Sequence, residues 1–166
     1  MVVQIRDFNE PDWPEVWPIF QEIIQAEETY PYDPTMTAEE AHSLWIEQPP
    51  AHTVVAVEAV EAGRIVGTAK MGPNRPGPGA HVSTASFMVA ANARGQGVGA
   101  ALCRHALAWA RTNGYAGMQF NAVVETNAVA VELYKRLGFT IIGTVPRAFA
   151  HKTLGRVGLH VMYCEF

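Results

Sequence analysis

The chain has 166 residues, of which 49% are hydrophobic and 17% are charged, and its formal net charge is −4. This length suits one domain over residues 1–166 with a buried core, and the composition excludes a wholly disordered chain. The acidic balance argues against non-specific nucleic-acid binding, and the absence of any run of ~18 apolar residues argues against a membrane span.

The first third of the chain predicts one strand and two helices. In chain order we expect a strand over Val2–Phe8, a helix capped by Asp12 that runs to about Glu28, and a helix over residues 38–47. Two prolines in Tyr30–Pro34 break regular structure between the helices. Thr37 and Glu40 have the spacing of a capping box, which predicts the start of the second helix.

The remainder of the chain alternates strands with helices. We expect strands over residues 53–60, 64–71, 81–89, 116–124, 140–145 and 157–166, and helices over residues 97–112 and 127–137. The first two of these strands form a hairpin, a Pro- and Gly-rich loop covers residues 72–79, and a loop separates the last two strands. Such a mixed order in a short chain predicts one α/β sandwich.

A glycine-rich segment lies between the strand over residues 81–89 and the following helix. It consists of Arg94, Gly95, Gln96, Gly97, Val98 and Gly99. Glycines let the backbone approach a ligand closely, and several N–H groups at a helix N-terminus attract anions. The segment therefore predicts a phosphate or pyrophosphate site, with an ordinary glycine-rich turn as the alternative.

Two other nucleotide motifs fit this segment less well. A phosphate-binding loop of the NTPase type needs Gly-Lys-Ser/Thr, but Ala100 and Ala101 follow Gly99. A dinucleotide fingerprint fits nominally at Gly95, Gly97 and Ala100. However, residues 90–94 separate the strand from the first glycine, and the rest of the chain is too short for a full doubly wound sheet.

Two motifs together resemble the GCN5-related N-acetyltransferase (GNAT) family. Arg94, Gly97 and Gly99 match the acetyl-CoA loop of that family. The second signature is matched in order by Asn127, Ala130, Leu133, Tyr134, Gly138 and Phe139. The resemblance covers residues 85–140. It implies an α/β (α+β) fold in which helices flank a mixed, mostly antiparallel sheet, and in which the central parallel strands over residues 81–89 and 116–124 splay apart around CoA.

The resemblance also implies roles for individual residues. The expected acetyl-CoA contacts are Val89, Arg94, Gly95, Gln96, Gly97, Val98, Gly99, Asn127 and Tyr134. The Val89 amide would polarise the thioester carbonyl, and the Tyr134 hydroxyl would donate a proton to the CoA thiolate. Tyr134 could instead pack in the core, and Asn127 could also cap its helix.

The general base is an open question in the sequence. Many relatives carry a glutamate near position 84, but no carboxylate occurs from His81 to Val89. The candidates are Glu28, Asp33, His81, Glu125 and His160, or an ordered water held by Asn121.

The acceptor site is expected near the first helix. The resemblance implies that the segment after this helix lies over the acceptor end of the cleft, and we expect the site to be lined by Glu28, Tyr30, Tyr32, Asp33 and Asn121. The composition fits this role, because carboxylates pair with amines and tyrosines supply flat contact area. The alternative is that this segment only connects two helices. In that case the pocket should lie near Gly72–His81 or Arg147–Gly158.

These features favour an acetyl-CoA-dependent N-acetyltransferase that acts on a primary amine of a small molecule or amino acid by direct attack on the thioester. Protein N-terminal or lysine acetylation and a non-catalytic acyl-CoA-binding module are the alternatives.

The six histidines lack metal-ligand spacing, so no metal is expected. Homodimers are common in the family.

The N-terminus and the cysteines favour a cytoplasmic location. No apolar stretch follows a basic start, so we expect no secretory signal. Cys103 and Cys164 lie far apart in the sequence, and we expect free thiols in a reducing compartment.

Overall fold

Strands rich in β-branched residues pair into one sheet in the computed structural model, which describes residues 1–166. The strands are β1 (Val3–Asp7), β2 (His52–Glu58), β3 (Ile65–Pro73), β4 (Val82–Val89), β5 (Gly117–Val124), β6 (Thr140–His151) and β7 (Gly155–Glu165). Their order in the sheet is β1-β2-β3-β4-β5-β7-β6. Only β4 and β5 are parallel, so the predicted mixed, mostly antiparallel sheet is confirmed.

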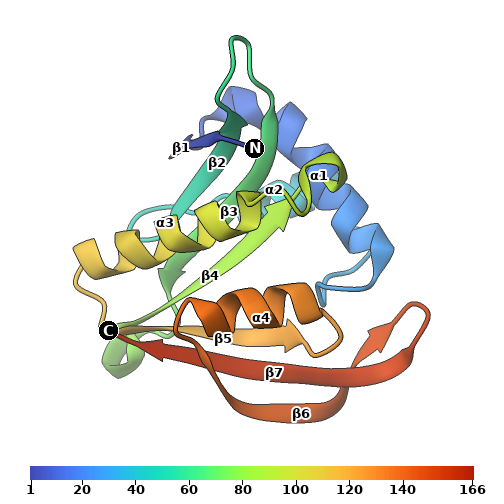
Figure 1. Cartoon of the computed structure of the whole chain (residues 1–166), viewed down its shortest axis with the longest axis vertical. Coiled ribbons are helices and arrows are strands. Elements are labelled where there is room, and N and C mark those ends of the chain that lie inside the picture. The colour runs from blue at the N-terminus through green and yellow to red at the C-terminus, as the bar shows by residue number, and fades with distance from the viewer.

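Four α-helices cover the two faces of the sheet (Figure 1). They are α1 (Trp13–Ala26), α2 (Ala38–Trp45), α3 (Val98–Thr112) and α4 (Ala128–Arg136). One buried cluster packs α1 and α2 against the sheet, and a second packs α3 and α4 against the opposite face. Adjacent residues Val54 and Val55 on β2 enter different clusters, as the alternation of a strand requires. None of the helices is long and apolar enough to cross a membrane.

The central strands separate soon after they meet. The parallel register of β4 and β5 consists of Val82 with Gly117 and Ser83 with Met118, and Figure 1 shows the strands diverging beyond it. On its other side β4 stays paired with β3, where the Ala90 amide donates to the Val66 carbonyl at 2.9 Å. Because backbone groups alternate along a strand, those of Phe87 and Val89 point away from β3 into the gap beside β5.

The start of the first helix differs from the prediction. Asp12 occupies the N-cap position of α1, but its side chain makes no cap hydrogen bond. Instead the carboxylate accepts two hydrogen bonds from Arg6, at 2.7 and 2.8 Å, and one from the Asn9 amide. This pairing holds the pKa of Asp12 below its usual value, mainly through the hydrogen bond from Arg6. Asp12 therefore ties α1 to β1 instead of capping the helix.

The prediction of a loop between the last two strands was wrong, because most of those residues belong to strands. β6 continues to His151 and β7 begins at Gly155, so the strands form one long hairpin. The register shifts between Val145 and Phe149, where Pro146 lacks an N–H and Arg147 has a φ of 54°. An edge strand tolerates such a bulge because its outer side has no partner strand.

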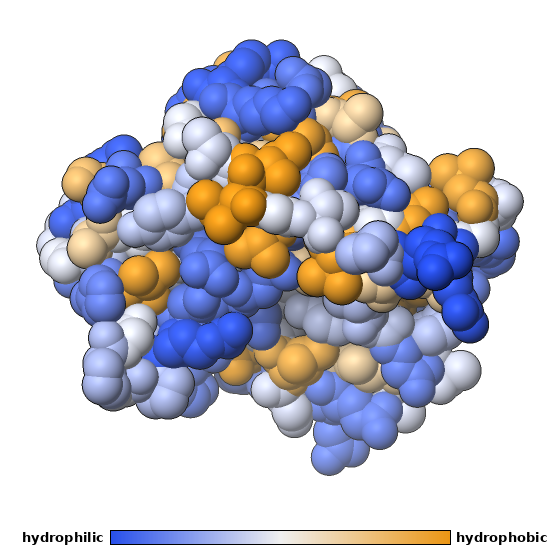
Figure 2. Space-filling model, turned by 90° about the horizontal axis from the view of Figure 1, so that it is seen from below, coloured by the Kyte–Doolittle hydropathy of each residue, from blue (hydrophilic) through white to orange (hydrophobic).

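The outer strand β6 leaves apolar side chains in solvent. Ile142 is 63% exposed and Val145 is 55% exposed. Seen from below, the surface of the molecule carries hydrophobic patches among polar ones (Figure 2).

Candidate active site

The glycine-rich segment forms a tight turn that leads from β4 into α3. A short 3-10 turn over Ala91–Ala93 follows β4, and α3 begins at Val98. Gly95 and Gly97 have φ values of 72° and 87°, in the region that favours glycine. A Cβ atom built at either position would meet no atom within 4 Å, so the backbone here is open to a ligand.

The first turn of α3 offers free backbone donors to an anion. Gly97 is the N-cap residue, and no side chain caps the helix. The first N–H groups of a helix have no partner within it, and together with the helix dipole they favour a phosphate group. Arg94 stands beside this turn with its guanidinium 3.1 Å from Glu22 of α1. These residues fit the pyrophosphate of CoA.

A cleft of about 900 Å³ runs from this turn into the gap between β4 and β5. Of the predicted CoA contacts, it is lined by Val89, Arg94, Gly95, Gly97, Val98, Gly99, Asn127 and Tyr134. Gln96 does not line the cleft, since its side chain donates to the Asn92 carbonyl at 2.7 Å. A cleft of this size accommodates an extended cofactor arm together with a small second substrate.

Tyr134 reaches the gap from the α3 and α4 face of the sheet. Its ring centroid lies 4.6 Å from that of Phe120 and 6.3 Å from that of Phe87. Burial raises the pKa of Tyr134 well above its usual value, with a smaller contribution from Cys103. The hydroxyl therefore keeps its proton near neutral pH, and it has no hydrogen-bond partner within the chain. The side chain both packs in the core and presents a donor to the cleft.

Asn127 also combines the two roles that the sequence left open. Its side-chain oxygen accepts a hydrogen bond from the Ala130 amide at 3.3 Å, so it caps α4. The same residue lines the cleft.

Comparison with known families agrees with this geometry. A sequence profile described as the Acetyltransferase (GNAT) family matches residues 4–139. The chain belongs to this family. Its GNAT fold and its activity as an N-acetyltransferase that uses acetyl-CoA follow from this membership, and the predicted resemblance is confirmed.

Individual relatives are similar over nearly the whole chain. A GCN5-related N-acetyltransferase from Kribbella flavida is 57% identical, with a TM-score of 0.95 and coverage of 99% of this chain and 98% of that one. N-acetyltransferase aca1 of Schizosaccharomyces pombe is 28% identical over 154 residues, which is 86% of this chain and 71% of the relative. YncA of Salmonella typhimurium, solved with its cofactor acetyl-CoA, shares the fold at 22% identity and a TM-score of 0.80, with 99% and 94% coverage.

In this GNAT chain, the segment after α1 forms one wall of the cleft. Glu28, Tyr30 and Tyr32 all line it. The Tyr30 hydroxyl donates to the Phe87 carbonyl at 2.7 Å and accepts from the Phe87 amide at 2.9 Å. It thus satisfies both backbone groups that the separation from β5 leaves unpaired. Burial raises the pKa of Tyr30 well above its usual value, and the nearby Tyr134 and Tyr32 raise it further by smaller amounts.

The two tyrosines therefore approach the gap from opposite sides. Tyr30 packs with the α1 and α2 cluster, whereas Tyr134 packs with the α3 and α4 cluster. Tyr32 is held by stacking on Phe20, with ring centroids 5.9 Å apart. The wall is fixed by hydrogen bonds and ring contacts.

Asp33 does not line the cleft, although the sequence placed it in the acceptor wall. Its exposed carboxylate accepts hydrogen bonds from the Thr35 amide at 2.8 Å and the Thr35 hydroxyl at 2.7 Å. Asn121 does line the cleft, where its side-chain amide donates to Asn74 at 2.7 Å.

Only one of the five side chains considered as general base lines the cleft, and that is Glu28. Glu125 accepts a hydrogen bond from the Gly158 amide, and His160 pairs with Thr144 at 2.7 Å. His81 is exposed at the start of β4, and Asp33 is bound to Thr35.

Several residues that line the cleft were not singled out in the sequence. They include Thr84, Ser86, Phe87, Phe120 and Arg136. The available signal was that Thr84 and Ser86 lie two residues apart and so share one face of a central strand, because a polar side chain on a covered face needs a partner or a ligand.

Proposed function

We propose that this chain transfers the acetyl group of acetyl-CoA to a primary amine of a small molecule. The observation that carries the proposal is the continuity of the cleft. It begins at the free N–H groups of α3, passes Tyr134 in the gap, and ends at the wall formed by Glu28, Tyr30 and Tyr32. Both substrates can therefore meet without a covalent enzyme intermediate.

Glu28 is the proposed site for the incoming amine. An ammonium group must lose a proton before it can attack a thioester, and a carboxylate in the cleft attracts the cation and orients it. Glu28 takes the proton directly or through a water, and the Asn121 side chain can hold such a water. The neutral nitrogen then forms the N–C bond as the C–S bond breaks, and the nitrogen of the new amide releases its extra proton to solvent.

Val89 and Tyr134 stabilise the charges that appear during transfer. The Val89 amide points into the gap and can donate to the thioester oxygen as negative charge develops there. Tyr134 carries a proton that it can pass to the departing sulfur, and solvent returns a proton to the phenolate. This assigns Tyr134 as the general acid.

The shape of the acceptor wall favours a small acceptor over a protein. The wall lies close on the sheet because Tyr30 is bonded to β4 and Tyr32 is stacked on α1. A protein N-terminus or lysine side chain needs an open approach for the residues around it.

We also propose a cytoplasmic location, since Cys103 and Cys164 are both buried and unpaired. A homodimer stays a prediction.

The test is a comparison of acceptors in one assay. Release of CoA thiol is followed with a thiol reagent in the presence of amino acids, simple amines and short peptides. We expect the highest kcat/KM with a small amine or amino acid. Faster turnover of peptide N-termini or peptide lysines would contradict the proposal, and acetyl-CoA binding without turnover of any amine would favour a non-catalytic module.

A further inference from the structure

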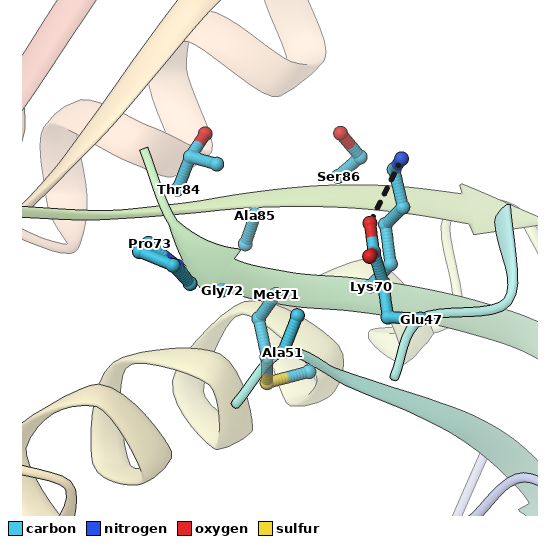
Figure 3. Close-up of a pocket in the computed structure, with 9 residues that line it drawn as sticks. All are labelled: Glu47, Ala51, Lys70, Met71, Gly72, Pro73, Thr84, Ala85 and Ser86. Atoms are coloured by element: carbon cyan, nitrogen blue, oxygen red, sulfur yellow. Dashed lines mark ion pairs between the residues drawn. The ribbon is translucent and has the colours of Figure 1, made fainter. Parts of the chain in front are cut away.

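A second pocket adjoins the acceptor end of the cleft. It has a volume of about 220 Å³ and lies between β3, β4 and the segment that follows α2 (Figure 3). It shares Thr84, Ala85 and Ser86 with the main cleft. A molecule that places one end in the gap beside Phe87 can therefore extend its other end along β4 into this pocket.

Lys70 is the cation of the pocket. It lies opposite Ser86 in the register of β3 and β4, and its side chain is only 18% exposed. The ammonium lies 3.2 Å from a Glu47 carboxylate oxygen, donates to the Leu44 carbonyl at 2.8 Å, and sits 5.7 Å from the centroid of the Trp45 ring. An ammonium has three N–H donors, so one remains for a ligand.

The polar side chains of the pocket are one ammonium, two hydroxyls and one carboxylate. Figure 3 shows the hydroxyls of Thr84 and Ser86 on the same side of the sheet as the Lys70 ammonium. Burial raises the pKa of the neighbouring Tyr32, the Glu47 charge adds to the shift, and a hydrogen bond with Ser86 opposes it, so Tyr32 stays protonated beside the pocket. The only anionic group is Glu47, which is more exposed and already paired with Lys70.

Gly72 and Ala51 form the apolar side of the pocket. Gly72 contributes no side chain to the pocket, and a Cβ atom there would lie 2.6 Å from the Cβ of Ala51. This side of the pocket is therefore close-packed. An incoming cation would find one carboxylate that is already neutralised. An incoming carboxylate would find a half-buried ammonium and the hydroxyls of Thr84 and Ser86.

We propose that this pocket binds the carboxylate of an amino-acid-type acceptor, with Lys70 as its counter-ion. The amine of the acceptor then faces the gap between Tyr30 and Tyr134. The inference rests on the proposed function, because it names the class of small amine that the site selects. In this arrangement Glu47 competes with the acceptor for Lys70, so the two residues have opposite effects on binding.

The test compares amino acids with their carboxamides, which keep the amine and remove the negative charge. For the wild-type protein we expect a lower KM for an amino acid than for its carboxamide. Lys70→Met keeps the aliphatic stem and removes the charge, so it should raise the amino-acid KM about 10-fold or more and leave the carboxamide KM nearly unchanged. Glu47→Gln should lower the amino-acid KM, because it frees the ammonium.

Lys135→Met is the matched control. Lys135 pairs with Glu132 at 3.1 Å on the exposed surface of α4 and does not line either pocket. Its kinetics with both acceptors should match the wild type. The KM for acetyl-CoA should also stay constant in all three variants, since the α3 turn is unaltered.

Several outcomes would overturn the inference. Equal KM values for amino acids and carboxamides in the wild type would do so, as would a higher amino-acid KM in Glu47→Gln, which would indicate a cation site. If Lys70→Met does not fold, Lys70→Arg and Glu47→Gln still show whether the pocket favours an anionic or a cationic group. Turnover only of amines without a carboxylate would refute this inference and leave the proposed function standing, whereas no turnover of any amine would refute both.

Discussion

The α3 end of the cleft is built from one short run of backbone, whereas the acceptor end is built from side chains that lie far apart in the sequence. Residues 94–99 supply the first end, and their contribution depends on the φ values of Gly95 and Gly97. The second end combines residues 28–32 with Lys70, Ser86 and Asn121. Backbone shape should therefore control acetyl-CoA binding, and side-chain chemistry should control the acceptor.

The largest expected effect lies between the two ends, at Tyr134. Tyr134→Phe keeps the ring contacts with Phe120 and removes the hydroxyl alone. We expect kcat to fall about 10²-fold or more, the usual contribution of a general acid, while affinity for acetyl-CoA changes little. Steady-state kinetics and calorimetry check the two parts. A normal kcat would return Tyr134 to a packing role.

Gly97→Val tests the backbone end. A β-branched residue at a φ of 87° is strained, so the turn must change shape and the N–H groups no longer converge. We expect acetyl-CoA to bind about 10- to 100-fold more weakly by calorimetry in a protein that remains folded. Gln96→Ala is the control, because its side chain points away from the cleft and its backbone is kept. Equal losses in both variants would contradict the contrast between the two ends.

Tyr30→Phe tests whether a side chain at the acceptor end also supports the sheet. Its hydroxyl satisfies both the N–H and the C=O of Phe87. Leaving these groups unpaired should lower the free energy of unfolding by about 1–3 kcal/mol in denaturant titrations. Tyr32→Phe should cost less, because the stacking of Tyr32 on Phe20 is retained. The reverse order would show that Phe87 finds other partners.

Glu28→Gln should have the smallest effect on binding and the most selective one. Glu28 is exposed, and exposed ion pairs contribute about 0.2–1 kcal/mol, so we expect the acceptor KM to rise up to ~5-fold. Acetyl-CoA affinity should stay unchanged. Because Glu28 is also the proposed proton acceptor, the activity of the variant should require higher pH than that of the wild type, where more of the amine is already neutral. An unchanged pH profile would leave Glu28 as a binding residue only.

The same contrast explains which parts of the molecule could be predicted from sequence. Local signals predicted most elements: Thr37 and Glu40 form the predicted capping box, and the glycine-rich segment leads from a strand into a helix as expected. The family motif over residues 127–139 identified Tyr134 and Asn127. The prediction of a loop after Val145 was wrong because a bulged edge strand lacks the regular alternation of an inner strand.

The acceptor end was harder to predict because its residues meet only in three dimensions. Lys70 and Ser86 are opposite one another through strand register, and Glu47 reaches Lys70 from the end of α2. No spacing in the sequence encodes these contacts. Asp33 illustrates the converse, since it adjoins Tyr32 in sequence and yet faces solvent.

The separation of β4 from β5 also links folding to substrate supply. The sheet leaves unpaired backbone donors in the gap, and a bound acetyl-CoA molecule fills the cleft that the unfolded chain does not possess. A ligand that binds only the folded state adds about 2.7 kcal/mol of stability at a concentration 100 times its Kd. The melting temperature of this protein should therefore report the acetyl-CoA concentration around it, and the chain should be most resistant to unfolding and proteolysis when acetyl-CoA is abundant.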